Sequence, residues 1–199
     1  MVRSVFIQHK VLELYRGMDT ISYPIHPETI LPYVPKSCRA MTYQKTAEVA
    51  GCDVLDIVLL CKSNSGATHY DIDQNRYLIL YNADMGAGRV RWTIGHEIGH
   101  ICLGHLEAIE EAEIAYTEQR ESYNQFESEA DCFAWNLLAP LPIMREMGIR
   151  SVEEVKTTYG LSNQASALQY DRYVKWCRGH IKTAWENNLL RVFRSKYVR

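Results

Sequence analysis

The 199-residue chain carries a formal net charge of −2, with 47% hydrophobic and 23% charged residues. These proportions are those of a folded globular protein and exclude a disordered chain. No apolar run approaches the length of a membrane span, and the N-terminus lacks the uninterrupted apolar stretch of a signal peptide. We expect an N-terminal helix and proline-containing arm over residues 1–40, a core over 41–145, and a C-terminal helical region with a basic tail over 146–199.

The cysteines and charges bear on where the protein works and what it binds. Its six cysteines are widely spaced, without a CxxC pair, in a chain large enough to need no disulfides, so we expect reduced thiols and a cytoplasmic location. Residues 107–131 hold nine acidic residues and one basic, and residues 172–199 hold eight basic and one acidic. We interpret both segments as solvated faces, so direct nucleic-acid binding is not expected.

The first 51 residues predict two helices separated by a proline-containing arm. Apolar residues recur at roughly helical spacing over residues 4–17. The segment from Pro24 to Pro35 contains four prolines and cannot continue this helix. Residues 42–51 are again predicted to be helical, with Thr42 as the N-terminal cap and Gly51 as the stop.

Three strands are expected next. Residues 56–62 (DIVLLCK) form an apolar run that favours a strand. A turn over residues 63–66 leads to a second strand over 68–73, and a further turn leads to the YLILY segment over 77–81. These strands and their short connections predict a small antiparallel sheet of about three strands.

Helices are expected to dominate the rest of the chain. Apolar residues follow the helical period over residues 89–105, and residues 107–122 are predicted to form an acidic, exposed helix. An apolar stripe over residues 126–138 predicts a helix that two prolines bring to an end. Two shorter helices are expected near residues 151–158 and 162–177. The predicted fold class is therefore α+β, with the small sheet packed on a bundle of helices.

The sequence HEIGH, beginning at His96, is an HExxH motif on a predicted helix. Residues four apart share a helix face, so the imidazoles of His96 and His100 can bind one metal ion. The carboxylate of Glu97 can reach a water molecule at that metal without binding the metal itself, which suits a general base. Gly95 and Gly99 each weaken the helix by roughly 1 kcal/mol relative to alanine, so we expect another helix to pack closely there.

An HExxH motif also occurs by chance on surface helices, so a third ligand decides whether a metal site exists. One class of zinc enzymes carries HExxHxxGxxH, but here Leu103 and Leu106 occupy the positions of the glycine and the third histidine. That class is therefore excluded. His105 lies five residues after His100, about 140° around a helix from the metal-binding face, and we interpret it as structural.

A second helix offers the third ligand in the segment ESEAD, where Glu127 and Asp131 share a face. Glu127 can bind zinc while Asp131 orients a ligand histidine through a carboxylate–imidazole contact. Glu129 is the competing ligand, but it lies about 160° of helical rotation from Asp131, so both cannot face the metal, and we prefer Glu127. Three protein ligands and a water predict a catalytic Zn²⁺ site, although cobalt or manganese suits similar donors.

These segments resemble the ImmA/IrrE family of bacterial and mobile-element metallopeptidases. The resemblance rests on RVRWTIGHEIGHICLGH at residues 89–105 and FESEADCFAWNLLAP at residues 126–140, and extends more loosely through residues 159–173. It implies a zincin-like, specifically gluzincin-like, core with Glu127 as the third ligand. It also implies a role as an anti-repressor that cleaves a helix-turn-helix repressor of mobile-element or stress genes. The chain departs from the family pattern at Gly95, where alanine is common.

We therefore predict a zinc-dependent endopeptidase in which Glu97 takes a proton from the attacking water and passes it toward the leaving amine. His69, Tyr70 and Tyr81 could reach the cleft from the sheet, but such residues are more often structural. The strand over residues 77–81 could pair with an extended substrate, unless it is an interior strand without a free edge.

Two other functions remain open. A non-enzymatic sensor or DNA-binding regulator could retain the zincin scaffold, since residues 42–57 and 159–173 faintly resemble helix-turn-helix segments. Neither segment has an obvious recognition helix rich in basic and amide groups. A housekeeping peptidase would differ only in its broader range of substrates, which digestion of a peptide mixture would reveal.

Overall fold

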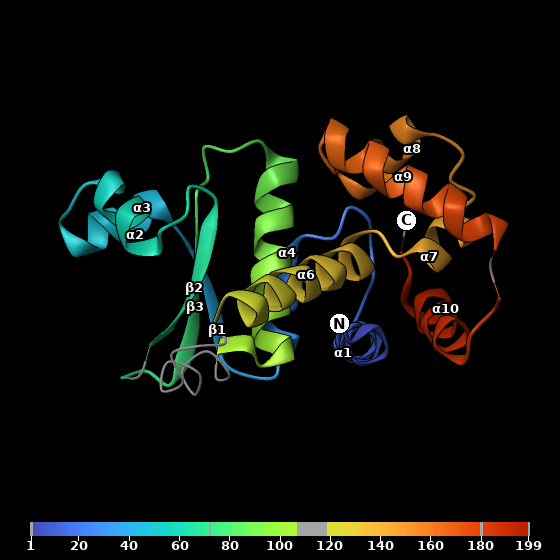
Figure 1. The fold of residues 1–199 in the computed structure, drawn as a ribbon, viewed down its shortest axis with the longest axis horizontal. Helices are drawn as coiled ribbons and strands as arrows, with labels where there is room; N and C mark the ends of the chain where they lie inside the picture. Colours follow the sequence, from blue (N-terminus) through green and yellow to red (C-terminus); the bar gives the residue numbers. More distant parts are fainter. Residues whose placement is uncertain (1, 72, 107–118, 180, 199) are drawn as a thin grey trace.

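The computed structural model describes residues 2–71, 73–106, 119–179 and 181–198. A small sheet stands beside the long helix α4, and the C-terminal helices gather at the other end of the molecule (Figure 1). The strands are β1 (Cys38–Thr42), β2 (Gly66–Asp71) and β3 (Arg76–Tyr81). The helices are α1 (Ser4–Gly17), the 3-10 helix η1 (Pro27–Tyr33), α2 (Tyr43–Ala50), α3 (Val54–Cys61), α4 (Ala87–Leu103), α6 (Gln119–Leu138), α7 (Leu141–Glu146), α8 (Val152–Tyr159), α9 (Asn163–Arg178) and α10 (Ala184–Lys196).

The sheet has the strand order β1-β3-β2, so β3 lies in the middle. β2 pairs with β3 in antiparallel fashion, whereas β1 runs parallel to β3, with Ala40 opposite Ile79. The α+β class is confirmed, but the prediction of a purely antiparallel sheet is wrong. β1 comes from the end of the predicted N-terminal arm, and the α2–α3 helix pair lies between it and β2. Among the described residues, β2 is paired on one side only.

The predicted strand over residues 56–62 is wrong, because this segment belongs to helix α3. A capping box starts α3, in which Asp53 accepts from the backbone of the first turn and Asp56 accepts from the backbone N–H of Asp53. Ile57 and Cys61, four residues apart, are buried, whereas Leu59 is 72% exposed. The apolar run therefore buries one side of a helix and exposes the other. The prediction of a strand did not anticipate this helical pattern of burial.

The two helices predicted within the first 51 residues are confirmed. Helix α1 covers the expected residues, and the Thr42 hydroxyl caps α2 by accepting from the backbone N–H of Lys45 at 3.0 Å. Gly51, with a φ of 66°, ends α2 in the left-handed conformation that glycine adopts at little cost. The proline-containing arm does not continue α1, but it includes the single 3-10 helix η1 among the described residues.

The two glycines of α4 mark its contact with α6, as expected. A Cβ at Gly99 would lie 3.2 Å from the Cα of Ala130, and one at Gly95 would lie 3.2 Å from the Leu138 side chain. The buried side chains of α4 and α6 form one core with those of α1, β3 and α10. The helix that carries HExxH is thus held directly against the helix that carries ESEAD.

The C-terminal half contains the expected helices α8 and α9, together with α7 and α10. Helix α10 returns to the N-terminal region, where the backbone N–H of Ile21 donates to the carbonyl of Lys196 at 2.9 Å. Most of the predicted acidic helix over 107–122 lies outside the described residues, and α6 begins at Gln119. Within the described ranges, no helix combines the length and the apolar character needed to cross a membrane.

Candidate metal centre

Helices α4 and α6 bring three side chains of the predicted site together. Glu127 Oε2 lies 3.3 Å from His96 Nε2, and Glu127 Oε1 lies 3.5 Å from His100 Nε2. The two Nε2 atoms are 3.0 Å apart. One donor atom from each residue falls within 4.8 Å of the others. These three residues could hold one metal ion.

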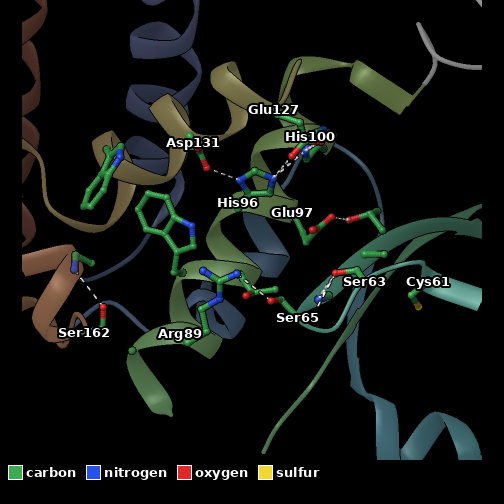
Figure 2. A pocket seen from close by; sticks show the side chains of 18 of the residues that line it. Cys61, Ser63, Ser65, Arg89, His96, Glu97, His100, Glu127, Asp131 and Ser162 are labelled. Atoms are coloured by element: carbon green, nitrogen blue, oxygen red, sulfur yellow. Dashed lines mark hydrogen bonds and ion pairs between the residues drawn. The ribbon is translucent and has the colours of Figure 1, made fainter. Parts of the chain in front are cut away.

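Asp131 lies on the outer side of His96, with its Oδ1 2.9 Å from Nδ1 of the ring. Figure 2 shows Glu127 and Asp131 on opposite sides of this imidazole. Burial alone would lower the pKa of His96, but the hydrogen bonds from Asp131 and Glu127 outweigh burial and raise this pKa. Burial and the neighbouring charge of His96 lower the pKa of His100. In the absence of a metal, His96 is therefore the more basic of the two imidazoles.

Glu97 points away from the histidines toward the sheet and accepts a hydrogen bond from the Thr68 hydroxyl at 2.7 Å (Figure 2). Burial raises the pKa of Glu97, while the charge of His96 and the Thr68 hydrogen bond oppose that rise. A carboxylate with a raised pKa holds a proton more readily than an exposed one, which suits a general base. Sequence reasoning missed Thr68, because a threonine within a strand carries no signal of a catalytic contact.

A cleft of about 880 Å³ opens onto these residues. One wall comes from the loop before β2 and from β2 itself, including Ser65 and Thr68, and Ser162 belongs to the opposite wall, at the start of α9. Trp92 and Trp135, with ring centroids 4.3 Å apart, add an apolar surface between them. Figure 2 shows Arg89 at some distance from the metal centre, where it donates to the Ser65 hydroxyl at 2.9 Å. The cleft thus offers both polar and apolar contacts beside the three converging side chains.

The three sheet residues considered for the cleft do not line it. The Tyr81 hydroxyl donates to Glu28 at 2.9 Å, and the Tyr70 hydroxyl donates to Asn75. His69 Nε2 lies 3.6 Å from the Cys61 sulfur. All three therefore make contacts typical of structural residues.

Glu129 and His105 lie behind the metal-binding face rather than in the cleft. Glu129 is fully buried and binds Arg3, so it does not join the converging donors. Helix α4 ends at Leu103, and the next residue, Gly104, has a φ of 72° that turns the chain back. His105 therefore approaches His100, and their Nδ1 atoms are 3.1 Å apart. The predicted helix through residue 105 was two residues too long, and for this reason the contact was missed.

The donor set fits a divalent metal such as zinc. Two imidazole nitrogens and one carboxylate form the three-ligand arrangement of catalytic zinc sites. The Nδ1 atoms of His96 and His100 are engaged by Asp131 and His105, which leaves each Nε2 directed toward Glu127.

Comparison with known proteins is consistent with this geometry. None of the curated proteins is similar enough to the chain to count as a match. The sequence model of the IrrE N-terminal-like domain, a peptidase family, matches residues 52–169, which is more than half of the chain and includes α4, α6 and the described cleft. The chain thus belongs to the ImmA/IrrE family of metallopeptidases.

Proposed function

We propose that this protein is a zinc-dependent endopeptidase that cleaves a helix-turn-helix transcriptional repressor. One observation carries the proposal: His96, His100 and Glu127 converge beside the buried carboxylate of Glu97 at the edge of an open cleft. When bound, zinc would supply Lewis-acid activation of the scissile carbonyl and of water. His96, His100 and Glu127 would hold it.

Glu97 acts as the general base in this proposal. Its carboxylate takes a proton from the attacking water and passes it to the leaving amine. Thr68 holds one carboxylate oxygen in place by donating to it. The strand β2 thus orients the base.

The substrate is expected to bind as an extended strand along β2. Residues 77–81 form the interior strand that was the alternative to a free edge, because β3 is paired on both sides. β2 has one unpaired side among the described residues, and its residues Gly66 to Thr68 line the cleft. Backbone pairing there would bring a peptide bond past Glu97. A folded helix cannot pair in this way, so cleavage should require a flexible or locally unfolded segment of the repressor.

The choice of a repressor as substrate is supported by family membership, and the cytoplasmic location by the cysteines. The structure pairs none of the six cysteines in a disulfide, and unpaired cysteines are usual in proteins of a reducing compartment. The resemblance to anti-repressors supplies the substrate class, and a repressor encoded by a neighbouring gene is the first candidate to test.

The alternative of a DNA-binding regulator receives less support from the surface of α3. Helices α2 and α3 are consecutive and pack together, but the large exposed side chains of α3 include Leu55, Leu59 and Leu60. Asp56 adds a negative charge. Reading of bases requires basic and amide groups, and phosphate contact requires positive charge. This face suits neither.

The proposal is tested by co-expressing the protein with the neighbouring repressor and identifying repressor fragments by mass spectrometry. Wild type should produce one or a few cuts, and Glu97→Gln should produce none while it retains the metal. An intact repressor in the presence of zinc-loaded wild type would overturn the proposal. Digestion of a peptide mixture at similar rates would instead support a broad housekeeping peptidase. Salt-dependent DNA binding without any metal requirement would favour the regulator.

A further inference from the structure

His105 is buried to 1% exposure and connects the metal centre to the opposite side of α6. Its Nδ1 lies 3.1 Å from Nδ1 of His100, and its Nε2 lies 3.2 Å from Oε2 of Glu129. The ring stacks on Phe126, with centroids 4.5 Å apart and planes at 21°. Its Nε2 also lies 3.5 Å from Nη2 of Arg3, so packing and three polar contacts fix the orientation of this imidazole.

The proton positions in this network follow from the need for a metal-binding nitrogen. His100 Nε2 faces Glu127 and must be unprotonated to bind a metal, so the ring proton is on Nδ1. That N–H donates to His105 Nδ1, which must then be the acceptor. His105 consequently carries its own proton on Nε2 and donates it to Glu129. Each ring has one permitted tautomer, and the chain of donors ends on a carboxylate.

Arg3 stabilises that carboxylate at the far end. Glu129 is fully buried, and an isolated buried carboxylate would be costly. Arg3 Nε donates to both carboxylate oxygens of Glu129, at 3.1 and 3.0 Å, and Arg3 Nη2 donates to Oε2 at 2.6 Å. The backbone N–H of Arg3 donates to Oε1 at 3.0 Å. Gln125 adds another donor at 3.1 Å. The anion that accepts from His105 is thus held by a residue 126 positions away in sequence.

We propose that His105, Glu129 and Arg3 form a positioning relay that fixes the tautomer and orientation of His100 for metal binding. The relay is the counterpart of Asp131, which makes the same type of contact to His96 directly. It rests on the proposed function, because it presupposes that His100 binds a metal. Outer partners of this kind commonly contribute about 10–100-fold to metal affinity.

The test measures zinc affinity by competition with a chromophoric chelator, and the visible absorption of the cobalt-substituted protein. His105→Phe retains an aromatic ring against Phe126 but removes the acceptor, and should weaken zinc binding by about 10–100-fold. His105→Asn offers an amide oxygen near the position of Nδ1 and should restore part of the loss. Both variants should change the cobalt spectrum, which reports the ligand field. A purely structural role predicts neither the change in spectrum nor the rescue by asparagine.

A second pair of variants serves if His105→Phe does not fold. Arg3→Gln removes the charge that holds Glu129. Lys10→Gln removes one charge from α1, the helix that follows Arg3, at a side chain paired with Glu13 instead. Arg3→Gln should weaken zinc binding and Lys10→Gln should not. Tyr15→Phe, which removes the hydroxyl donated to the Leu137 carbonyl, should lower stability without changing zinc affinity.

The relay is refuted if folded His105→Phe binds zinc as tightly as wild type, if His105→Asn is as weak as His105→Phe, or if Arg3→Gln and Lys10→Gln behave alike. A wild-type protein that binds no zinc would refute the proposed function itself. The two failures are therefore distinguishable.

Discussion

At Gly99 the helix α4 comes close to the backbone of α6, and replacement of this glycine by alanine tests how the two ligand-bearing helices are held. The added Cβ would lie 3.2 Å from the Cα of Ala130 and 3.2 Å from the Cβ of Phe133. Four residues earlier in the same helix, a Cβ at Gly95 would meet only the side chain of Leu138, at 3.2–3.6 Å. Gly95→Ala is therefore a matched control, with the same chemical change on the same helix against the same partner.

The two variants should differ in the sign of their effect on stability. Alanine improves helix propensity by about 1 kcal/mol at either position. At Gly95 a flexible leucine can move, so most of this gain should remain. At Gly99 the neighbour is partly backbone, and overpacking of this kind costs about 1–3 kcal/mol, which cancels or exceeds the gain. We expect Gly99→Ala to be less stable than Gly95→Ala by about 1–3 kcal/mol.

Thermal unfolding of the metal-free proteins measures this difference without a contribution from bound zinc. A change of 1 kcal/mol shifts the Tm of a chain this long by about 2–4 °C, so Gly99→Ala should melt roughly 2–12 °C below Gly95→Ala. Zinc affinity should fall in Gly99→Ala, because a displaced α6 moves Glu127 relative to the histidines. Equal melting temperatures, or a more stable Gly99→Ala, would refute the close contact as the reason for glycine.

Three further outcomes follow from the site and the fold. Thr68→Val should shift the acidic limb of the pH–rate profile to higher pH, because the lost hydroxyl no longer stabilises the charged form of Glu97. An unshifted limb would contradict the role of Thr68 in orienting the base. Zinc at 100 times its Kd should stabilise wild type by about 2.7 kcal/mol, measured as a rise in Tm, and His100→Ala should lose that rise. In urea unfolding, Ile57→Ala should lower the free energy of unfolding by about 2–5 kcal/mol, and Leu59→Ala should lower it much less. Similar losses in the two variants would argue against an exposed Leu59 on α3.

The elements with clear periodicity and local punctuation could be predicted from the sequence. Helix α2 has a capping threonine at one end and a left-handed glycine at the other, and both signals are local. The HExxH motif and the ESEAD segment also depend on spacing within a single helix. Their convergence could be inferred because the ligand chemistry of zinc requires it.

The errors arose where local sequence is ambiguous or where the contact is distant. The run DIVLLCK has no alternation, and a short apolar run is compatible with either a helix or a strand. Its capping box, from Asp53 and Asp56, was the available signal for a helix. By contrast, the parallel pairing of β1 with β3 spans the α2–α3 pair, and the contact of Arg3 with Glu129 spans most of the chain. No local pattern encodes either contact.

The segment ESEAD shows how helical phase assigns different roles to neighbouring carboxylates. Two residues correspond to about 200° of rotation, so Glu127 and Asp131 project to one face of α6 and Glu129 to the opposite one. On the cleft side, Glu127 meets both histidines and Asp131 meets the outer nitrogen of His96. On the buried side, Glu129 needs the cation of Arg3 and can then accept from His105. A deletion of Ser128 would turn Glu127 by about 100° relative to Glu129 and Asp131, so the spacing of the acids, and not only their number, is what the proposed metal centre requires.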